Sequence, residues 1–172
     1  GLCSFNLRNT KNALYHFNEA ESNYILSSRT KGLSKVYNNL ASFYSVLIIE
    51  EEKAIDYYQK AIALKNKNAD SSGLSRSYYN IASLFFNLGV SDSSIYYAKL
   101  AASYSVYIDD NLADTYYLLS ILYTKKNMLE SALYYSNKRG EMLKGKVERS
   151  ILDAQKLIAE KLQGGGGSQP PP

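Results

Sequence analysis

Apolar residues recur every three or four positions along most of the chain, with polar residues between them. One such stripe is formed by Tyr78, Ile81, Ala82, Phe85 and Leu88. This spacing predicts an amphipathic helix. Gly89 suits the left-handed residue that ends such a helix, and the Ser/Asp cluster at 91–94 suits the start of the next one. Alternation with period two is absent, so we expect no strands.

Small residues return at fixed intervals and reveal a repeat. Ala82, Ser94 and Ala101 are separated by steps of 12 and 7. The equivalent sets are Gly1, Ala13 and Ala20; Ala41, Ala54 and Ala61, with steps of 13 and 7; and Ser120, Ala132 and Arg139. Copies begin 40, 41 and 38 residues apart, which predicts a solenoid of helical hairpins. We expect the two helices of a hairpin to cross closely where small residues meet, at Ala41/Ala54 and Ala82/Ser94.

The periodicity divides the chain into expected helices. They cover residues 1–8, 10–28, 32–48, 50–66, 71–88, 91–107, 110–126, 128–144 and 146–162. We interpret residues 1–145 as an array of one partial and three full repeats, in which the last repeat packs differently because Arg139 replaces a small residue. Prolines are confined to 170–172, which favours long uninterrupted helices before them.

The repeat resembles the tetratricopeptide repeat (TPR) family over residues 1–145. The residues that carry the resemblance are Leu7, Ala13, Phe17 and Ala20; Tyr37, Leu40, Ala41, Tyr44, Ala54, Tyr58 and Ala61; Tyr78, Ile81, Ala82, Phe85, Gly89, Ser94 and Ala101; and Tyr116, Leu119, Ser120, Tyr123 and Ala132. The copies are longer than the usual 34 residues and lack the terminal proline, as in long-helix members from bacterial regulators and cargo adaptors. The resemblance implies an all-α, right-handed α-α superhelix that binds partners in its concave groove.

The end of the chain departs from the repeat. Residues 146–163 carry a stripe of Val147, Ile151, Ala154, Ile158 and Leu162, which predicts a final helix. This helix either caps the last hairpin or serves as a connector that transmits a signal or dimerises. Residues 164–172 read as a Gly/Ser linker with a Pro-rich tail. They are either engineered or a tethered peptide that binds the groove of its own or a neighbouring chain.

Composition and charge narrow the classes of function. The net charge of +4 arises within 125–161, where nine basic residues meet five acidic ones. We interpret this excess as a solvated helix face and expect no nucleic-acid partner. No apolar run is long enough to span a membrane, no signal peptide is visible, and the lone Cys3 leaves the compartment open between cytoplasm and periplasm.

No pattern for catalysis or cofactor binding is present. The single histidine, His16, lies beside Tyr15 and Phe17 on an expected helix, and no Cys/His cluster has metal-ligand spacing. No glycine-rich phosphate loop occurs, and the acidic run at 50–52 is explained by a helix start. We therefore expect a protein that is not an enzyme and that carries no cofactor or metal.

The groove implied by the resemblance is lined by the first helix of each hairpin. The expected peptide-binding residues are Lys35, Asn38, Asn39, Ser42, Arg76, Tyr79, Asn80, Ser83, Phe86, Asn87, Tyr117 and Ile121. Asn39 and Asn80 occupy equivalent positions, and their amides can donate to and accept from a peptide backbone. Alternatively, they are ordinary surface residues.

Tyr79, Phe86, Tyr117 and Ile121 are expected to form an apolar floor, or alternatively to pack between hairpins. Chaperone adaptors of the TPR family bind a C-terminal carboxylate at points that here carry Asn38, Ser42, Asn80, Asp114 and Leu118. Asn80 alone fits and Asp114 would repel a carboxylate, so we exclude that ligand class.

Three functions remain as hypotheses. The leading one is a protein-interaction module that binds a peptide in the concave groove. The second is the sensory part of a bacterial signalling or transcription regulator, and the third is a self-associating structural array.

Overall fold

The computed structural model describes residues 2–105 and 110–164, and the side chains of 9–47, 49–105, 111–153, 155 and 156. Within these residues the chain is helical throughout, without strands. The elements are α1 (Leu2–Leu26), α2 (Thr30–Phe43), the π-helical turn η1 (Tyr44–Ile48), α3 (Glu51–Lys67), α4 (Ser71–Asn87), α5 (Ser91–Tyr104), α6 (Asp110–Lys125) and α7 (Leu129–Gly164). The prediction of an all-α fold is confirmed.

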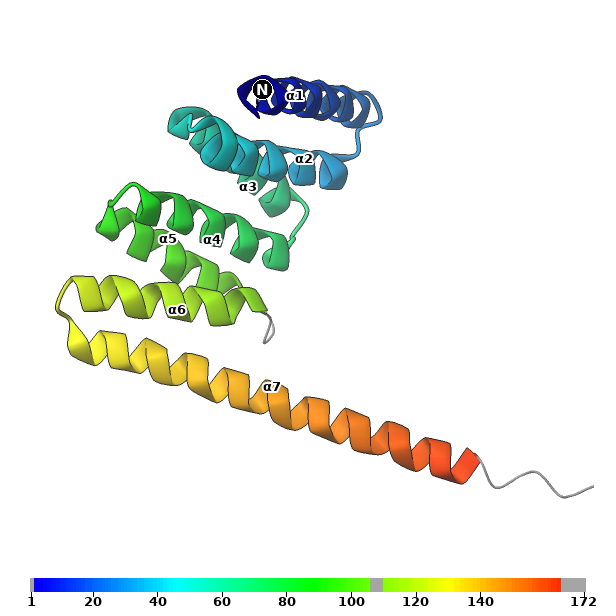
Figure 1. Ribbon diagram of the computed structural model, residues 1–172, viewed down its shortest axis with the longest axis vertical. Helices are drawn as coiled ribbons and strands as arrows, with labels where there is room; N and C mark the ends of the chain where they lie inside the picture. The colour runs from blue at the N-terminus through cyan, green and yellow to red at the C-terminus, as the bar shows by residue number, and fades with distance from the viewer. Residues whose placement is uncertain (1, 106–109, 165–172) are drawn as a thin grey trace, which may run out of the picture.

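The helices form three antiparallel hairpins, α2–α3, α4–α5 and α6–α7, stacked one beside the next (Figure 1). Neighbouring hairpins join through α3–α4 and α5–α6, while α1 packs on α2. The first helices, α2, α4 and α6, lie along one side of the stack, with α3 and α5 behind them (Figure 1). This arrangement brings first helices from consecutive hairpins next to each other.

The two helices of a hairpin cross at the small residues, as the sequence predicted. Ala41 and Ala54 are both fully buried and belong to one core cluster. In the next hairpin, the hydroxyl of Ser94 donates a hydrogen bond of 2.7 Å to the backbone carbonyl of Ala82. A larger side chain at these positions would separate the two backbones, because the interior is already closely packed.

A set of three aromatic rings recurs in every hairpin and explains the richness in tyrosine. Parallel stacked pairs form between Tyr44 and Tyr57, Phe85 and Tyr97, and Tyr123 and Tyr135, with ring centroids 5.5–5.6 Å apart. A third ring packs on the ring that the second helix supplies to each pair: Tyr37 on Tyr57, Tyr78 on Tyr97 and Tyr116 on Tyr135. Stacked rings add stabilisation beyond the area they bury.

Most of the helices end in the same way, with one residue of positive φ. Gly89 has φ 75°, as predicted, and Ser28, Ala69 and Asn127 adopt similar values in their loops. After Gly89, the amide of Val90 bonds back to the carbonyl of Phe85. This bond satisfies a carbonyl that the helix end would otherwise leave unpaired.

The turn η1 accommodates the extra residue in the second repeat. Ala41 and Ala54 are 13 residues apart, whereas the equivalent residues of the later hairpins are 12 apart. A π turn takes up one additional residue within a helix, and it ends at Ile49, with φ 60°. As a result, Val46, Leu47 and Ile49 are 71%, 66% and 70% exposed.

Two expected helix boundaries are wrong. The helices expected at 1–8 and 10–28 are one helix, α1, and those expected at 128–144 and 146–162 are one helix, α7. Neither junction holds a proline, and Gly145 costs only about 1 kcal/mol within a helix, which is too little to end it.

The segment 146–163 therefore does not fold back as a separate cap. It continues α7 away from the stack (Figure 1), and Val147, Ile151 and Leu152 are exposed. Its alternative role as a connector stays a prediction. Of the expected linker and tail at 164–172, Gly164 is instead the last residue of α7, and 165–172 lie outside the described residues.

Candidate functional site: the face between α2 and α4

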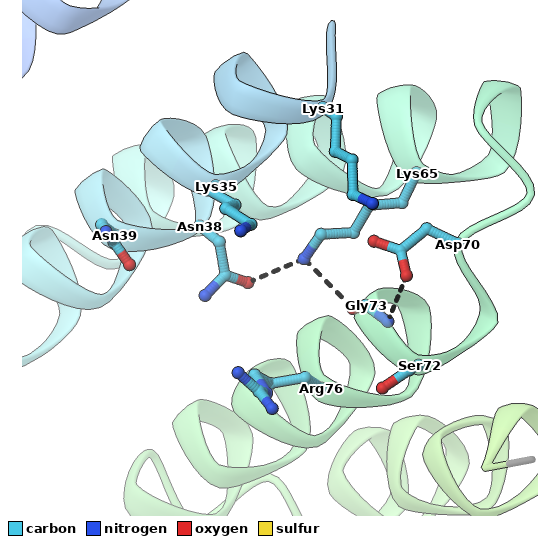
Figure 2. Close-up of a pocket in the computed structure, with 9 residues that line it drawn as sticks. All are labelled: Lys31, Lys35, Asn38, Asn39, Lys65, Asp70, Ser72, Gly73 and Arg76. Carbon is cyan, nitrogen blue, oxygen red and sulfur yellow. Dashed lines mark hydrogen bonds between the residues drawn. The ribbon is translucent and has the colours of Figure 1, made fainter.

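Two hollows lie end to end along the face between α2 and α4. The first, which we name the basic hollow, has a volume of about 410 Å³ and is lined by Lys31, Lys35, Asn38, Asn39, Lys65, Asp70, Ser72, Gly73 and Arg76 (Figure 2). The second, the distal hollow, has a volume of about 570 Å³ and is lined by Ser42, Ser45, Val46, Ile49, Glu51, Tyr58, Asn80, Ser83, Leu84, Asn87 and Leu88.

The floor of the basic hollow is a buried polar network around Lys65. Its ammonium group donates hydrogen bonds to Ser77 Oγ at 2.6 Å, to the carbonyl of Gly73 at 3.1 Å and to Asn38 Oδ1 at 3.4 Å. Ser77 in turn donates to Asn38 Oδ1 at 2.9 Å. The network ties α2, α3 and α4 together, and Lys65 itself is only 4% exposed.

Burial lowers the pKa of Lys65 from 10.5 to about 8. Removing an ammonium group from water disfavours its charged form. The nearby carboxylate of Asp70 opposes this shift, and the charge of Arg76 adds to it. The charged form of Lys65 is thus destabilised by its burial.

The basic hollow has a large excess of positive charge. Lys31, Lys35 and Arg76 are exposed at its rim. Within the described part of the chain, neither they nor Lys65 form an ion pair with a carboxylate. The one carboxylate that lines the hollow, Asp70, caps α4 by accepting the Gly73 amide at 2.9 Å.

The distal hollow combines amides, hydroxyls and apolar side chains. Asn80, Ser83 and Asn87 reach it from α4, while Ser42 reaches it from α2 and is 3.1 Å from the hydroxyl of Tyr58. Burial raises the pKa of Tyr58, so its hydroxyl stays protonated at neutral pH.

The face includes most of the sequence-predicted binding residues. Eight of them line one hollow or the other: Lys35, Asn38, Asn39 and Arg76 the first, and Ser42, Asn80, Ser83 and Asn87 the second. Among the described residues, the side chains of Asn39 and Asn80 have no hydrogen-bond partner, so both amides are open to a ligand. Asn38 differs from expectation, because it is 9% exposed and its carbonyl oxygen is used by Lys65 and Ser77.

The expected apolar floor does not line these hollows. Tyr79 and Phe86 pack, partly buried, against the cluster around Leu118 and Leu122, as the alternative interpretation held. The ammonium of Lys125 also covers the Phe86 ring at 4.2 Å.

Tyr117 and Ile121, on α6, lie outside both hollows as well. The guanidinium of Arg139 covers the Tyr117 ring at 4.6 Å, so this residue makes a ring contact where the other repeats have alanine. Ile121 is half-buried.

Sequence reasoning missed Lys31, Lys65, Asp70, Ser72 and Gly73 at the basic hollow, and Ile49, Glu51, Tyr58, Leu84 and Leu88 at the distal hollow. Lys65 had a detectable signal, because it continues the buried stripe of Ala54, Tyr58 and Ala61 at helical spacing. A lysine in a core stripe needs polar partners. The partners come from other helices, which the sequence pattern does not place.

The described residues form neither a metal-binding cluster nor a membrane-spanning helix. They contain no cluster of His, Cys, Asp and Glu side chains that could hold a metal ion. No helix among them is both long and apolar enough to cross a bilayer.

The fold and this face define an array of helical hairpins with a polar, basic surface. No family model matches the chain, and no curated protein matches it. A solved structure with a similar fold is described as "Crystal structure of BtubC (BKLC) from P. vanneervenii". The match has a TM-score of 0.67 at 14% identity and covers 95% of this chain and 61% of that one. This likeness shows the fold, and the TPR resemblance stays a prediction.

Proposed function

We propose that the chain is a non-enzymatic protein-interaction module that binds a peptide segment along the face between α2 and α4. The observation that carries the proposal is the pair of hollows end to end on this face, each with an open asparagine amide, Asn39 or Asn80. A segment that spans both hollows passes both amides.

The chemistry of the amides supports binding of a peptide backbone. Each asparagine side chain offers two donors and one carbonyl acceptor, which match the C=O and N–H groups of a peptide. Because Asn39 and Asn80 occupy the same position in consecutive repeats, one backbone can meet them in succession.

The apolar side chains at the distal hollow support binding of a side chain from the same segment. Val46, Ile49 and Leu88 line this hollow and are 71%, 70% and 41% exposed. Burying such surface on binding contributes about 25 cal/mol per Å² before the costs of association.

A display selection tests the proposal. A library of random twelve-residue peptides is selected on the purified chain, and enriched peptides are measured by isothermal titration calorimetry against wild type and an Asn39→Ala/Asn80→Ala variant. We expect about tenfold weaker binding to the variant, with an unchanged melting temperature, because neither amide bonds to another described residue. Asn137→Ala, at an exposed position on α7, is the matched control and should bind as wild type.

Two results would contradict the proposal. One is that no peptide is enriched. The other is that enriched peptides bind wild type and the double variant with equal affinity.

Self-association through α7 is a second candidate function. It is favoured by the exposed apolar residues Val147, Ile151 and Leu152 on the part of α7 that leaves the stack. Sedimentation equilibrium across concentrations should then show a dimer in wild type and a monomer in Val147→Glu/Ile151→Glu. A wild-type monomer at all concentrations would exclude it. The sensory role and the binding of the Pro-rich tail stay predictions.

A further inference from the structure

We propose that the basic hollow binds an oxyanion, a carboxylate or a phosphate, carried by an acidic stretch of the bound peptide. This inference rests on the proposed function, and it specifies the chemical class of the partner.

The first argument is unbalanced charge. Four cationic side chains from α2, α3 and α4 line one hollow, and Asp70 is the carboxylate among its lining residues. Asp70 caps α4 and forms no ion pair with any of the four, although its charge still favours the charged form of Lys65. Like charges gathered in one place repel each other, and a bound anion would relieve that repulsion.

The second argument is that stacking of the hairpins does not require Lys65. The equivalent position in the next repeat, 40 residues on, is Ser105, and the same kind of junction forms there between α4, α5 and α6. Among the described residues of that junction, the hydrogen bonds join neutral groups: Ser75 donates to the carbonyl of Ala101 and accepts a bond from the side-chain amide of Asn111. Among the described side chains, Lys65 is therefore the one buried ammonium, and no carboxylate forms an ion pair with it.

The third argument is geometry. Figure 2 shows the side chains of Lys31 and Lys35 on one side of the Lys65 ammonium and Arg76 on the other, with the first turn of α4 alongside. Arginine can bind a carboxylate or phosphate through two parallel hydrogen bonds, and lysines add charge. The cavity of about 410 Å³ has room for such a group with its waters.

Titration with inorganic phosphate tests the anion site. Phosphate is added at constant ionic strength, with chloride as the reference, and is followed through the backbone amides of Ser72 and Gly73 and the side-chain carbon resonances of Lys65. We expect saturable shifts at these positions and an upward change in the pKa of Lys65, because a bound anion favours the charged ammonium.

Variants localise the effect. Lys35→Gln/Arg76→Gln should weaken phosphate binding by about fivefold or more, since hydrogen bonds to charged groups are lost. Lys67→Gln is the matched control, because Lys67 is exposed on α3 and lies outside the hollow. Shifts no larger than with chloride, or equal weakening by Lys67→Gln and Lys35→Gln/Arg76→Gln, would overturn the inference.

Peptides distinguish the two sources of the anion and separate this inference from the proposed function. Peptides from the display selection should carry acidic residues and bind Arg76→Gln more weakly; phosphoserine or glutamate at the same place then shows which group is preferred. Selected peptides that lack acidic residues and bind wild type and Arg76→Gln with equal affinity would contradict the inference. The proposed function would remain supported. Phosphate binding without any selected peptide would contradict the proposed function and the peptide as the source of the anion, and would leave an anion site alone.

Discussion

Lys65 is energetically unfavourable in the folded state, because its charged ammonium group is buried. Its ammonium is 4% exposed, and its three hydrogen bonds go to Asn38, Ser77 and a backbone carbonyl, none of them charged. Hydrogen bonds offset part of the desolvation cost, but no carboxylate neutralises the charge. The lowered pKa of about 8 reflects the part of the desolvation cost that the hydrogen bonds do not offset.

The lowered pKa predicts a pH dependence of stability. The unfolded chain holds the Lys65 proton up to about pH 10.5, whereas the folded chain releases it above about pH 8. Between these values the unfolded state binds more protons, so the free energy of unfolding should rise with pH, by up to about 3 kcal/mol in total. Urea denaturation between pH 7 and 9 measures this slope.

Lys65→Met supplies the control for this prediction. Methionine fills similar space without a titratable group, so the difference in stability between wild type and variant should shrink or reverse as pH rises. Parallel pH curves for the two proteins would show that the Lys65 pKa is not lowered by folding.

Ile49 is a second strained residue, because a β-branched side chain rarely adopts φ 60°. Ile49→Gly should raise the free energy of unfolding by about 1 kcal/mol, since the side chain is 70% exposed and little burial is lost. The reciprocal change, Gly89→Ala, should lower it by about 1 kcal/mol through backbone strain alone, because no atom lies within 4 Å of the added carbon. Denaturation of the two variants beside wild type checks both signs, and destabilisation by Ile49→Gly would contradict the assigned conformation.

At the scale of elements, the features predicted from the sequence are those set by residues close together along the chain. The crossings at Ala41/Ala54 and Ala82/Ser94 and the end of α4 at Gly89 follow from spacing and from local conformational preference. The 13-residue step also contained the signal for η1, although a π turn could not be told from a longer loop without backbone hydrogen bonds.

The long helix α7 was not predictable as one element. The boundary expected between 128–144 and 146–162 falls at Gly145, but the cost of a glycine within a helix is small compared with the cost of starting a new helix. Whether a segment folds back or continues is decided by packing, and the described apolar residues after Gly145 are each more than half exposed.

Exposure of the distal part of α7 predicts uneven protection from hydrogen exchange. Backbone amides after about residue 146 should exchange quickly, because an unsupported helix is marginally stable. Amides of Leu119 and Leu122, whose side chains are fully buried in α6, should exchange slowest. Exchange measured by mass spectrometry checks this, and equal protection in both regions would indicate that a second copy covers α7.

At the scale of the whole molecule, the stack places function between elements that are not adjacent in sequence. Helices α2 and α4 are separated by α3, and both hollows form along their shared face. Helical periodicity identified Asn39, Asn80 and Arg76 as facing this side. It could not separate Asn38 from Asn39, since that depends on where α3 and α4 place Lys65 and Ser77.

The central claim is that a partner binds this face, with its anionic group in the basic hollow. The most direct measurement is chemical-shift mapping of a selected acidic peptide on the isotope-labelled chain. The account predicts the largest changes at the side-chain amides of Asn39 and Asn80 and the backbone amide of Gly73. Largest changes on the outer surfaces of α3 and α5, or on α7 beyond Gly145, with those three signals unmoved, would contradict it.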